Sequence, residues 1–289
     1  MMFKATPLPQ SLLAVILFVL VTSCSSNSLK EPTPEEKRAT VYYEKGTNDL
    51  VAKDYIQALS NLLEAKKYDP KNAKIRTNLA MAYYFRNQLE LAIYELKEAI
   101  SIDEKNSDAK LNLATIYMEK NKLKEARDLF NEVEKDLTFK NQFRNYYNMA
   151  LLNLKEGDRR EAFDYLSKSI KERNDYCLAH YKLGLLYAEE YKFKQAYDAF
   201  KESGKGTCVN EVAPQYQMAM ALVNLNRSED AKRKFQEIIE KFPSDRYATM
   251  ASIQIRKLSD SSNESSKQSL RTEQIKNTDN NQTTESPNF

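Results

Sequence analysis

The sequence of 289 residues is poor in glycine, lacks tryptophan and contains a single histidine. Its five glycines are few even for a helical protein, and no Gly-rich phosphate-binding loop is present. Long alternating runs of β-branched residues are also missing, which leaves little room for a β-sheet. His180 has no Ser, Cys or Asp motif beside it in a nucleophile arrangement, so a packing role is favoured over catalysis. These absences predict an all-α protein that is not an enzyme and needs no cofactor.

Charge of one sign is not in excess either. The 44 basic and 41 acidic residues give a net charge of +3 and are interspersed along the chain. No block of like charge offers a footprint for nucleic acid, so nucleic acid is not an expected partner. The charges are best interpreted as the solvated faces of helices.

One stretch, HYKLGLLYAEEYKFKQAYDAF (180–200), shows the pattern that organises the chain. Gly184 and Tyr187 share a face of a first helix, while Ala196 and Phe200 face them from a second. Because two helices approach closely only where small side chains meet, Gly184 and Ala196 set the crossing of a helical hairpin. A hairpin this short needs similar neighbours to cover its apolar stripe.

Those neighbours are present. Equivalent alanines recur at intervals of 34, 34, 36, 34 and 35 residues, namely Ala58, Ala92, Ala126, Ala162, Ala196 and Ala231. A small residue lies twelve positions before each alanine: Gly46, Ala80, Ala114, Ala150, Gly184 and Ala219. A large apolar residue lies four positions after it: Leu62, Leu96, Phe130, Leu166, Phe200 and Phe235. The chain therefore contains six phased copies of one hairpin.

This pattern resembles the tetratricopeptide repeat, which reads W-x2-L-G-x2-Y, then A-x3-F, then P. The resemblance covers residues 39–258, although the family's Trp is absent from every copy. It implies a right-handed superhelical solenoid of six repeats, with the segment after Pro243 as a C-terminal capping helix. Asn87 and Asn121 fall in hairpin turns, where a left-handed residue often ends the first helix.

The N-terminal segment reads as a lipoprotein signal. Residues 1–23 contain Lys4 and an apolar run over 12–21 that is too short to span a membrane comfortably, which needs about 20 residues. The run ends at Val-Thr-Ser-Cys, which resembles the bacterial lipobox and implies that Cys24 is lipidated; a buried or disulfide-bonded Cys24 is the alternative. Ser25 after the cysteine implies sorting to the outer membrane. Residues 24–38 would then tether the domain to the lipid, which anchors without crossing the bilayer.

At the other end, residues 259–289 are rich in Ser, Asn, Gln, Thr and charge, with few large apolar side chains. Such a composition predicts a disordered polar tail.

Cys177 and Cys208 begin and end the fifth repeat, which places both near one edge of adjacent first helices. A disulfide between them is expected in an exported protein, and the loop would contribute roughly 3–4 kcal/mol. Two free thiols are the main alternative. A metal site using Cys177, His180 and Cys208 is a third interpretation, but a closed zinc site needs about four ligands and no fourth is evident.

Repeat geometry in the resembling family points certain first-helix positions into a groove. In this chain these positions are rich in aromatic residues and methionine, which suit an apolar partner segment better than an acidic peptide. The predicted groove contacts are Tyr43, Met81, Tyr84, Met118, Tyr147, Tyr181 and Met220. The alternative is that much of this stripe packs between adjacent repeats.

The lipobox, the six repeats and the final helix together resemble the type IV pilus pilotins, the PilF/PilW/Tgl lipoproteins. That resemblance implies a monomeric scaffold in the bacterial envelope, facing the periplasm from the outer membrane, that binds secretin subunits and assists their assembly. Two alternatives stay open: a lipoprotein scaffold of the β-barrel assembly type, and an adaptor for cell-wall enzymes. An undetected enzyme is a remote third.

Overall fold

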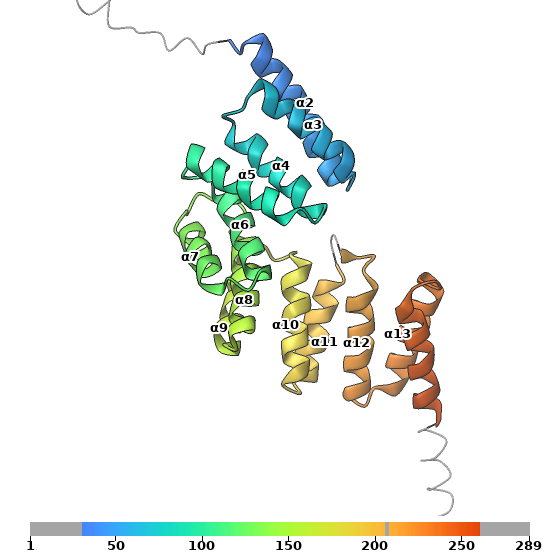
Figure 1. The fold of residues 1–289 in the computed structure, drawn as a ribbon. Coiled ribbons are helices and arrows are strands. Elements are labelled where there is room, and N and C mark those ends of the chain that lie inside the picture. Colours follow the sequence, from blue (N-terminus) through green and yellow to red (C-terminus); the bar gives the residue numbers. More distant parts are fainter. Residues whose placement is uncertain (1–30, 206–207, 261–289) are drawn as a thin grey trace, which may run out of the picture. The chain divides into compact units, whose positions relative to one another are not determined.

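The computed structural model describes residues 31–205 and 208–260, which divide into two compact units at the Gln88–Leu89 junction. In these ranges the ordered elements are helices, and no residue is in a strand (Figure 1). No helix of the described residues is long and apolar enough to cross a membrane. The predicted all-α repeat architecture is confirmed.

Unit 1 contains three labelled helices, α2 (Pro34–Val51), α3 (Tyr55–Tyr68) and α4 (Ala73–Phe85). Helices α2 and α3 form an antiparallel hairpin, and α4 packs on both of them. Leu62, Leu79 and Ala58 form the centre of the unit's core and have no exposed surface.

Unit 2 continues the same arrangement with nine labelled helices: α5 (Leu89–Ile102), α6 (Ser107–Glu119), α7 (Leu123–Glu134), α8 (Gln142–Glu156), α9 (Arg159–Glu172), α10 (Cys177–Glu189), α11 (Phe193–Ser203), α12 (Val212–Asn224) and α13 (Ser228–Lys241). A further helix covers 246–260. Each helix packs mainly on its neighbours in the sequence, and Figure 1 shows α10 to α13 side by side. Contacts between near neighbours are the signature of a stacked repeat.

The residues that carry the repeat pattern form the core. All six marker alanines and all six large residues after them are at most 1 % exposed. A Cβ added to Gly184 would lie 2.6 Å from ring atoms of Phe200, and one added to Gly46 would lie 2.6 Å from Cγ of Leu62. The small position therefore faces the large one across the hairpin, as the sequence pattern predicts.

The hairpin turns share one backbone conformation. The residue five positions before each marker alanine has a positive φ, in the order Lys53, Asn87, Asn121, Gly157, Tyr191 and Asn226. The left-handed conformation ends the first helix, and Gly and Asn adopt it at the least cost. The expectation for Asn87 and Asn121 is thus confirmed, while lysine and tyrosine occupy the same turn at a conformational cost.

The folded region begins earlier than the sequence analysis places it. Helix α2 starts at Pro34, inside the predicted 24–38 tether. Thr33 and Glu36 form a reciprocal capping box, and Pro34 lies in the first turn, where its missing N–H is no loss. Residues 34–38, predicted to belong to a tether, are therefore helical.

At the other end the helix over 246–260 covers the last repeat, as expected of a capping helix. Ala251 has no exposed surface, and Tyr247, Ile255 and Leu258 pack on the core of α12 and α13. The helix reaches residue 260, two residues past the predicted boundary at 258. The predicted signal segment, Cys24 and the rest of the predicted tail lie outside the described residues.

Candidate functional site

The seven predicted groove residues are divided between the two units. Unit 1 carries Tyr43, Met81 and Tyr84, and unit 2 carries Met118, Tyr147, Tyr181 and Met220. Each set is therefore described within its own unit.

In unit 1, Tyr43 packs between helices. Its half-buried side chain contacts the clusters around Leu62 and Ile75. One turn later, the Thr47 hydroxyl donates to the Tyr43 carbonyl over 2.8 Å and accepts from the Asn78 amide over 2.9 Å. This chain of hydrogen bonds joins α2 to α4, so Tyr43 belongs to the contact between successive repeats.

Met81 and Tyr84 keep part of their surface exposed on α4. The Tyr84 ring meets Phe85 edge to face at 5.2 Å, and Phe85 stacks on Tyr55 at 4.6 Å. Phe85 is 48 % exposed, so unit 1 presents aromatic surface near its hairpin turn. Aromatic side chains of this kind are common anchors at protein interfaces.

In unit 2, Met118 is a core residue. It is only 5 % exposed and packs with Ala126, Phe130 and Leu152. Because a partner cannot reach this side chain, the prediction of Met118 as a groove contact is wrong. The twelfth first-helix position turns toward the core here rather than toward solvent.

Tyr147 is largely buried. Its ring meets Tyr176 perpendicularly at 5.5 Å, and Tyr176 in turn meets Phe143 at 4.8 Å. Burial raises the pKa of the Tyr147 hydroxyl to about 12, because the charged form would lose its hydration. This tyrosine contributes more to the packing between α8 and the start of α10 than to an open surface.

Tyr181 and Met220 are half-buried on α10 and α12. The Tyr181 ring lies 5.9 Å from that of Phe200. Burial, followed by the neighbouring Tyr247, raises the pKa of Tyr181. Met220 lies beside the cluster of α12, α13 and the final helix. Tyr181 and Met220 therefore retain accessible surface, as does part of Tyr147.

The two cysteines of the fifth repeat come together. Cys177 at the start of α10 and Cys208 before α12 are joined as a disulfide, with Cα atoms 6.1 Å apart. That distance lies in the usual range for a disulfide. His180 lies one turn after Cys177, where its Nε2 is 2.8 Å from the carbonyl of Asn174. No group of three potential metal ligands gathers anywhere in the described ranges.

The lengthened link between α7 and α8 is held by two amides that the sequence analysis did not single out. Gln142 donates to the carbonyls of Val133 and Asp136 over 2.7 and 3.0 Å. Asn145 has no exposed surface and donates to the Phe130 carbonyl over 3.1 Å. Polar residues in an otherwise apolar helix face were the available signal, because buried amides need partners.

Models of the tetratricopeptide repeat match residues 87–139, 143–176 and 215–245. The chain therefore contains tetratricopeptide repeats over these residues. These matches lie in phase with the six copies found in the sequence, and the helices of the structure follow them.

Among known proteins, the chain is similar to the type IV pilus assembly protein PilF of Pseudomonas aeruginosa. The two are 29 % identical over 196 residues, which cover 67 % of this chain and 78 % of the relative. The solved structure of Pseudomonas aeruginosa PilF superimposes with a TM-score of 0.64 at 17 % identity, covering 79 % of this chain and 100 % of that one.

A second solved structure, of the type IV pilus biogenesis factor PilW, also has a TM-score of 0.64. It is 18 % identical and covers 73 % of this chain and 97 % of its own. At such identities the superpositions show the shared fold. Together with the sequence similarity to PilF, they identify a tetratricopeptide scaffold related to type IV pilus biogenesis factors.

Proposed function

We propose that this protein is a non-enzymatic, lipid-anchored scaffold that assists assembly or localisation of the type IV pilus secretin in the outer membrane. The observation that carries the proposal is the sequence similarity to PilF, which extends over 196 residues and 78 % of that relative. A match of this length spans several repeats rather than one.

The proposed anchor is a lipid on Cys24, which would hold the protein to the outer membrane so that it faces the periplasm. Support comes from the sequence, where an apolar run over 12–21 ends at Val-Thr-Ser-Cys. Stable anchoring by lipid needs more than one acyl chain or a second membrane-binding signal. Helix α2 begins at Pro34, so only about ten residues would separate the lipid from the folded domain.

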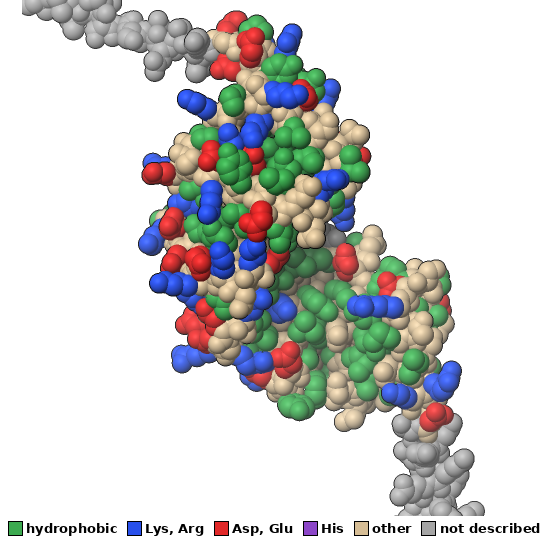
Figure 2. Space-filling view, in the orientation of Figure 1, with side chains coloured by type: hydrophobic (Ala, Val, Ile, Leu, Met, Phe, Trp, Pro, Cys, Tyr) green, Lys and Arg blue, Asp and Glu red, His purple; other side chains and the backbone are tan. Residues whose placement is uncertain are grey.

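Each unit carries its own proposed partner surface, made of half-buried side chains: Met81 and Tyr84 in unit 1, and Tyr181 and Met220 in unit 2. None of these is charged, so an apolar client segment suits them better than an acidic tail. Tyrosine loses little rotamer freedom on binding, and methionine adapts to irregular surfaces. Figure 2 shows hydrophobic side chains gathered over α10 to α12, with charged ones denser over α6 to α9.

Affinity purification from detergent-solubilised envelopes tests the client. The tagged full-length protein should retain secretin subunits, and Cys24→Ala should move the protein into the soluble fraction. If β-barrel assembly proteins or a cell-wall hydrolase are retained in place of secretin, the protein serves that other machine. Mass analysis of the mature N-terminus checks the lipid directly, and an unmodified chain cut elsewhere would contradict the anchor.

A tyrosine comparison then tests the surface. Tyr181→Ala should weaken client binding more than about tenfold if Tyr181 is an anchor. Tyr191→Ala is the matched control, because Tyr191 is 81 % exposed in a hairpin turn and lies off the first-helix face. Binding should also survive 1 M salt, where the Debye length falls to about 3 Å and a charge clamp would weaken. If Tyr181→Ala binds the client as tightly as Tyr191→Ala does, the client binds a surface that does not include Tyr181.

A further inference from the structure

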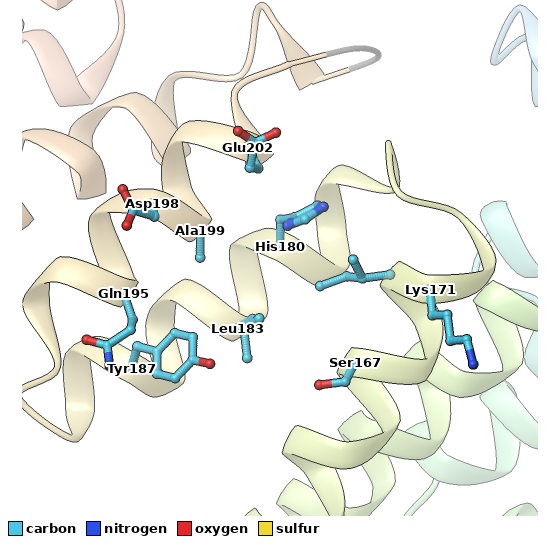
Figure 3. A pocket seen from close by; sticks show the side chains of 10 residues that line it. Ser167, Lys171, His180, Leu183, Tyr187, Gln195, Asp198, Ala199 and Glu202 are labelled. Atoms are coloured by element: carbon cyan, nitrogen blue, oxygen red, sulfur yellow. The ribbon is translucent and has the colours of Figure 1, made fainter.

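Unit 2 has an apolar furrow between two second helices of successive repeats, distinct from the first-helix face discussed above. Helix α9 forms one wall, α11 forms the other, and α10 forms the floor (Figure 3). The furrow has a volume of about 480 Å³ and opens to solvent. Its floor consists of His180, Leu183 and Tyr187, which lie one helical turn apart along α10.

The same place in the preceding repeat is filled. There the Tyr165 ring stacks on Tyr146, with centroids 6.2 Å apart. The Lys168 ammonium lies 4.4 Å from the centre of the Tyr165 ring and forms an ion pair with Glu134 at 3.3 Å. Two aromatic rings and an ion pair therefore occupy the space between α7 and α9.

One repeat further along the chain, each of these four positions has changed. By the register of the marker alanines, Ala199 replaces Tyr165, His180 replaces Tyr146, Glu202 replaces Lys168 and Ile170 replaces Glu134. The loss of the second ring opens the furrow, and Ile170 makes its wall apolar. Four substitutions thus open the furrow, three in repeat five and one, Ile170, in repeat four.

Charge differs between the two walls. The α11 wall carries Asp198 and Glu202, whose carboxylates pair with Lys194 at 2.9 Å and Lys205 at 2.7 Å. Both pairs are solvent-exposed, and such pairs contribute little, about 0–1 kcal/mol, so a partner cation can replace the local lysine.

The α9 wall is net basic. It carries Lys171 beside the furrow, and Arg160 with Asp164 where the furrow continues past Tyr187 toward the end of α10. No described residue forms an ion pair with Lys171 or Arg160. A segment lying in the furrow would therefore meet acid on one side and a net positive charge on the other.

We propose that this furrow binds an amphipathic helical segment of a partner protein. Its apolar stripe would rest on Leu183 and Tyr187, and its basic flank would face Asp198 and Glu202. A helix fits because the floor side chains are three and four residues apart, the spacing at which a bound helix presents its own anchors. The charge difference between the walls selects one orientation of the flanks.

Two fluorescein-labelled peptides of equal length test the proposal. Both carry a leucine stripe at helical spacing; the matched peptide has lysine on one flank and glutamate on the other, and the second peptide has glutamate on both flanks. Fluorescence anisotropy with the full mature chain should show at least tenfold tighter binding of the matched peptide, whose lysine flank suits the α11 wall. The double variant D198K/E202K should reverse that preference, because both walls are then basic.

Ala199→Tyr locates the binding. The preceding repeat accommodates Tyr165 at this position, so the variant should fold, fill the furrow and weaken binding of the matched peptide at least tenfold. Lys201→Tyr is the matched control, because Lys201 is exposed on the same helix and does not line the furrow. If Ala199→Tyr fails to fold, the D198K/E202K variant alone tests whether the peptide binds in the furrow.

Three results would overturn the proposal. Equal affinity for the two peptides would remove the role of the charged walls. Unchanged binding by Ala199→Tyr would place the peptide on another surface. Failure of both peptides to bind the full chain, as expected if its own residues 261–289 occupy the furrow, would also refute a site for a partner.

Discussion

Gly184→Ala tests the close approach on which the hairpin packing depends. The new Cβ would lie 2.6 Å from Cδ1 and Cε1 of Phe200, a separation that real contacts do not show. Phe200 is 1 % exposed, so its ring has no free space to enter. Overpacking of this kind costs about 1–3 kcal/mol, against a gain of about 1 kcal/mol from replacing glycine by alanine inside a helix.

The expected net effect is a loss of up to about 2 kcal/mol in the free energy of unfolding, measured by denaturant titration of the mature domain. Gly204→Ala is the control, because the nearest atom to its Cβ would be 3.6 Å away. A second change, Phe200→Leu, supplies the leucine that follows Ala80 and Ala150 in repeats two and four. The double variant G184A/F200L should be more stable than the sum of the two single effects by about 1 kcal/mol or more.

The reasoning is refuted if Gly184→Ala is more stable than the natural protein. That result would mean that Phe200 moves aside freely and that the glycine does not set the helix separation. Additive single effects in the double variant would equally show that the two positions are not coupled.

Three further predictions concern other parts of the chain. Tyr191→Asn should stabilise the protein by about 0.5–1 kcal/mol, because the residue has φ 58° and three equivalent turns use Asn; a loss of stability in thermal unfolding would contradict this. Tyr147→Phe should flatten the decline in the free energy of unfolding between about pH 10 and pH 12. The raised pKa of about 12 keeps Tyr147 neutral in the folded protein, whereas the unfolded chain loses that proton near pH 10. The contribution of Tyr147 to stability is therefore complete below pH 10 and falls by at most about 3 kcal/mol above it. Thiol counting without reductant should find Cys177 and Cys208 unreactive. Reduction should lower the melting temperature, since a closed loop of 31 residues contributes roughly 3–4 kcal/mol to stability. Detection of two free thiols would contradict the disulfide.

The sequence by itself determined the repeat fold, because its information is local and periodic. Ala196, Gly184 and Phe200 recur at fixed offsets, and side chains at such offsets share a helix face whatever the rest of the chain does. The turn residues Asn87 and Asn121 were predictable for the same reason, since a positive φ is a property of a few adjacent residues.

The binding surfaces were only partly predictable. Met118 follows the groove pattern of the repeat, yet the neighbouring helices enclose it in the core. The start of α2 at Pro34 has a local signal in the capping box of Thr33 and Glu36, but the polar composition of the stretch is also typical of a tether.

Tertiary structure alone decided the furrow. Its opening depends on Ala199 in one repeat and Ile170 in the preceding one, which come from α11 and α9 and meet only when both pack on α10. Ala199 taken alone in the sequence does not show that an aromatic ring fills the equivalent place in the preceding repeat, nor which helix that ring would contact. Exposure is a property of neighbouring helices taken together, so the packing of successive hairpins determines which apolar residues become core and which remain open to a partner.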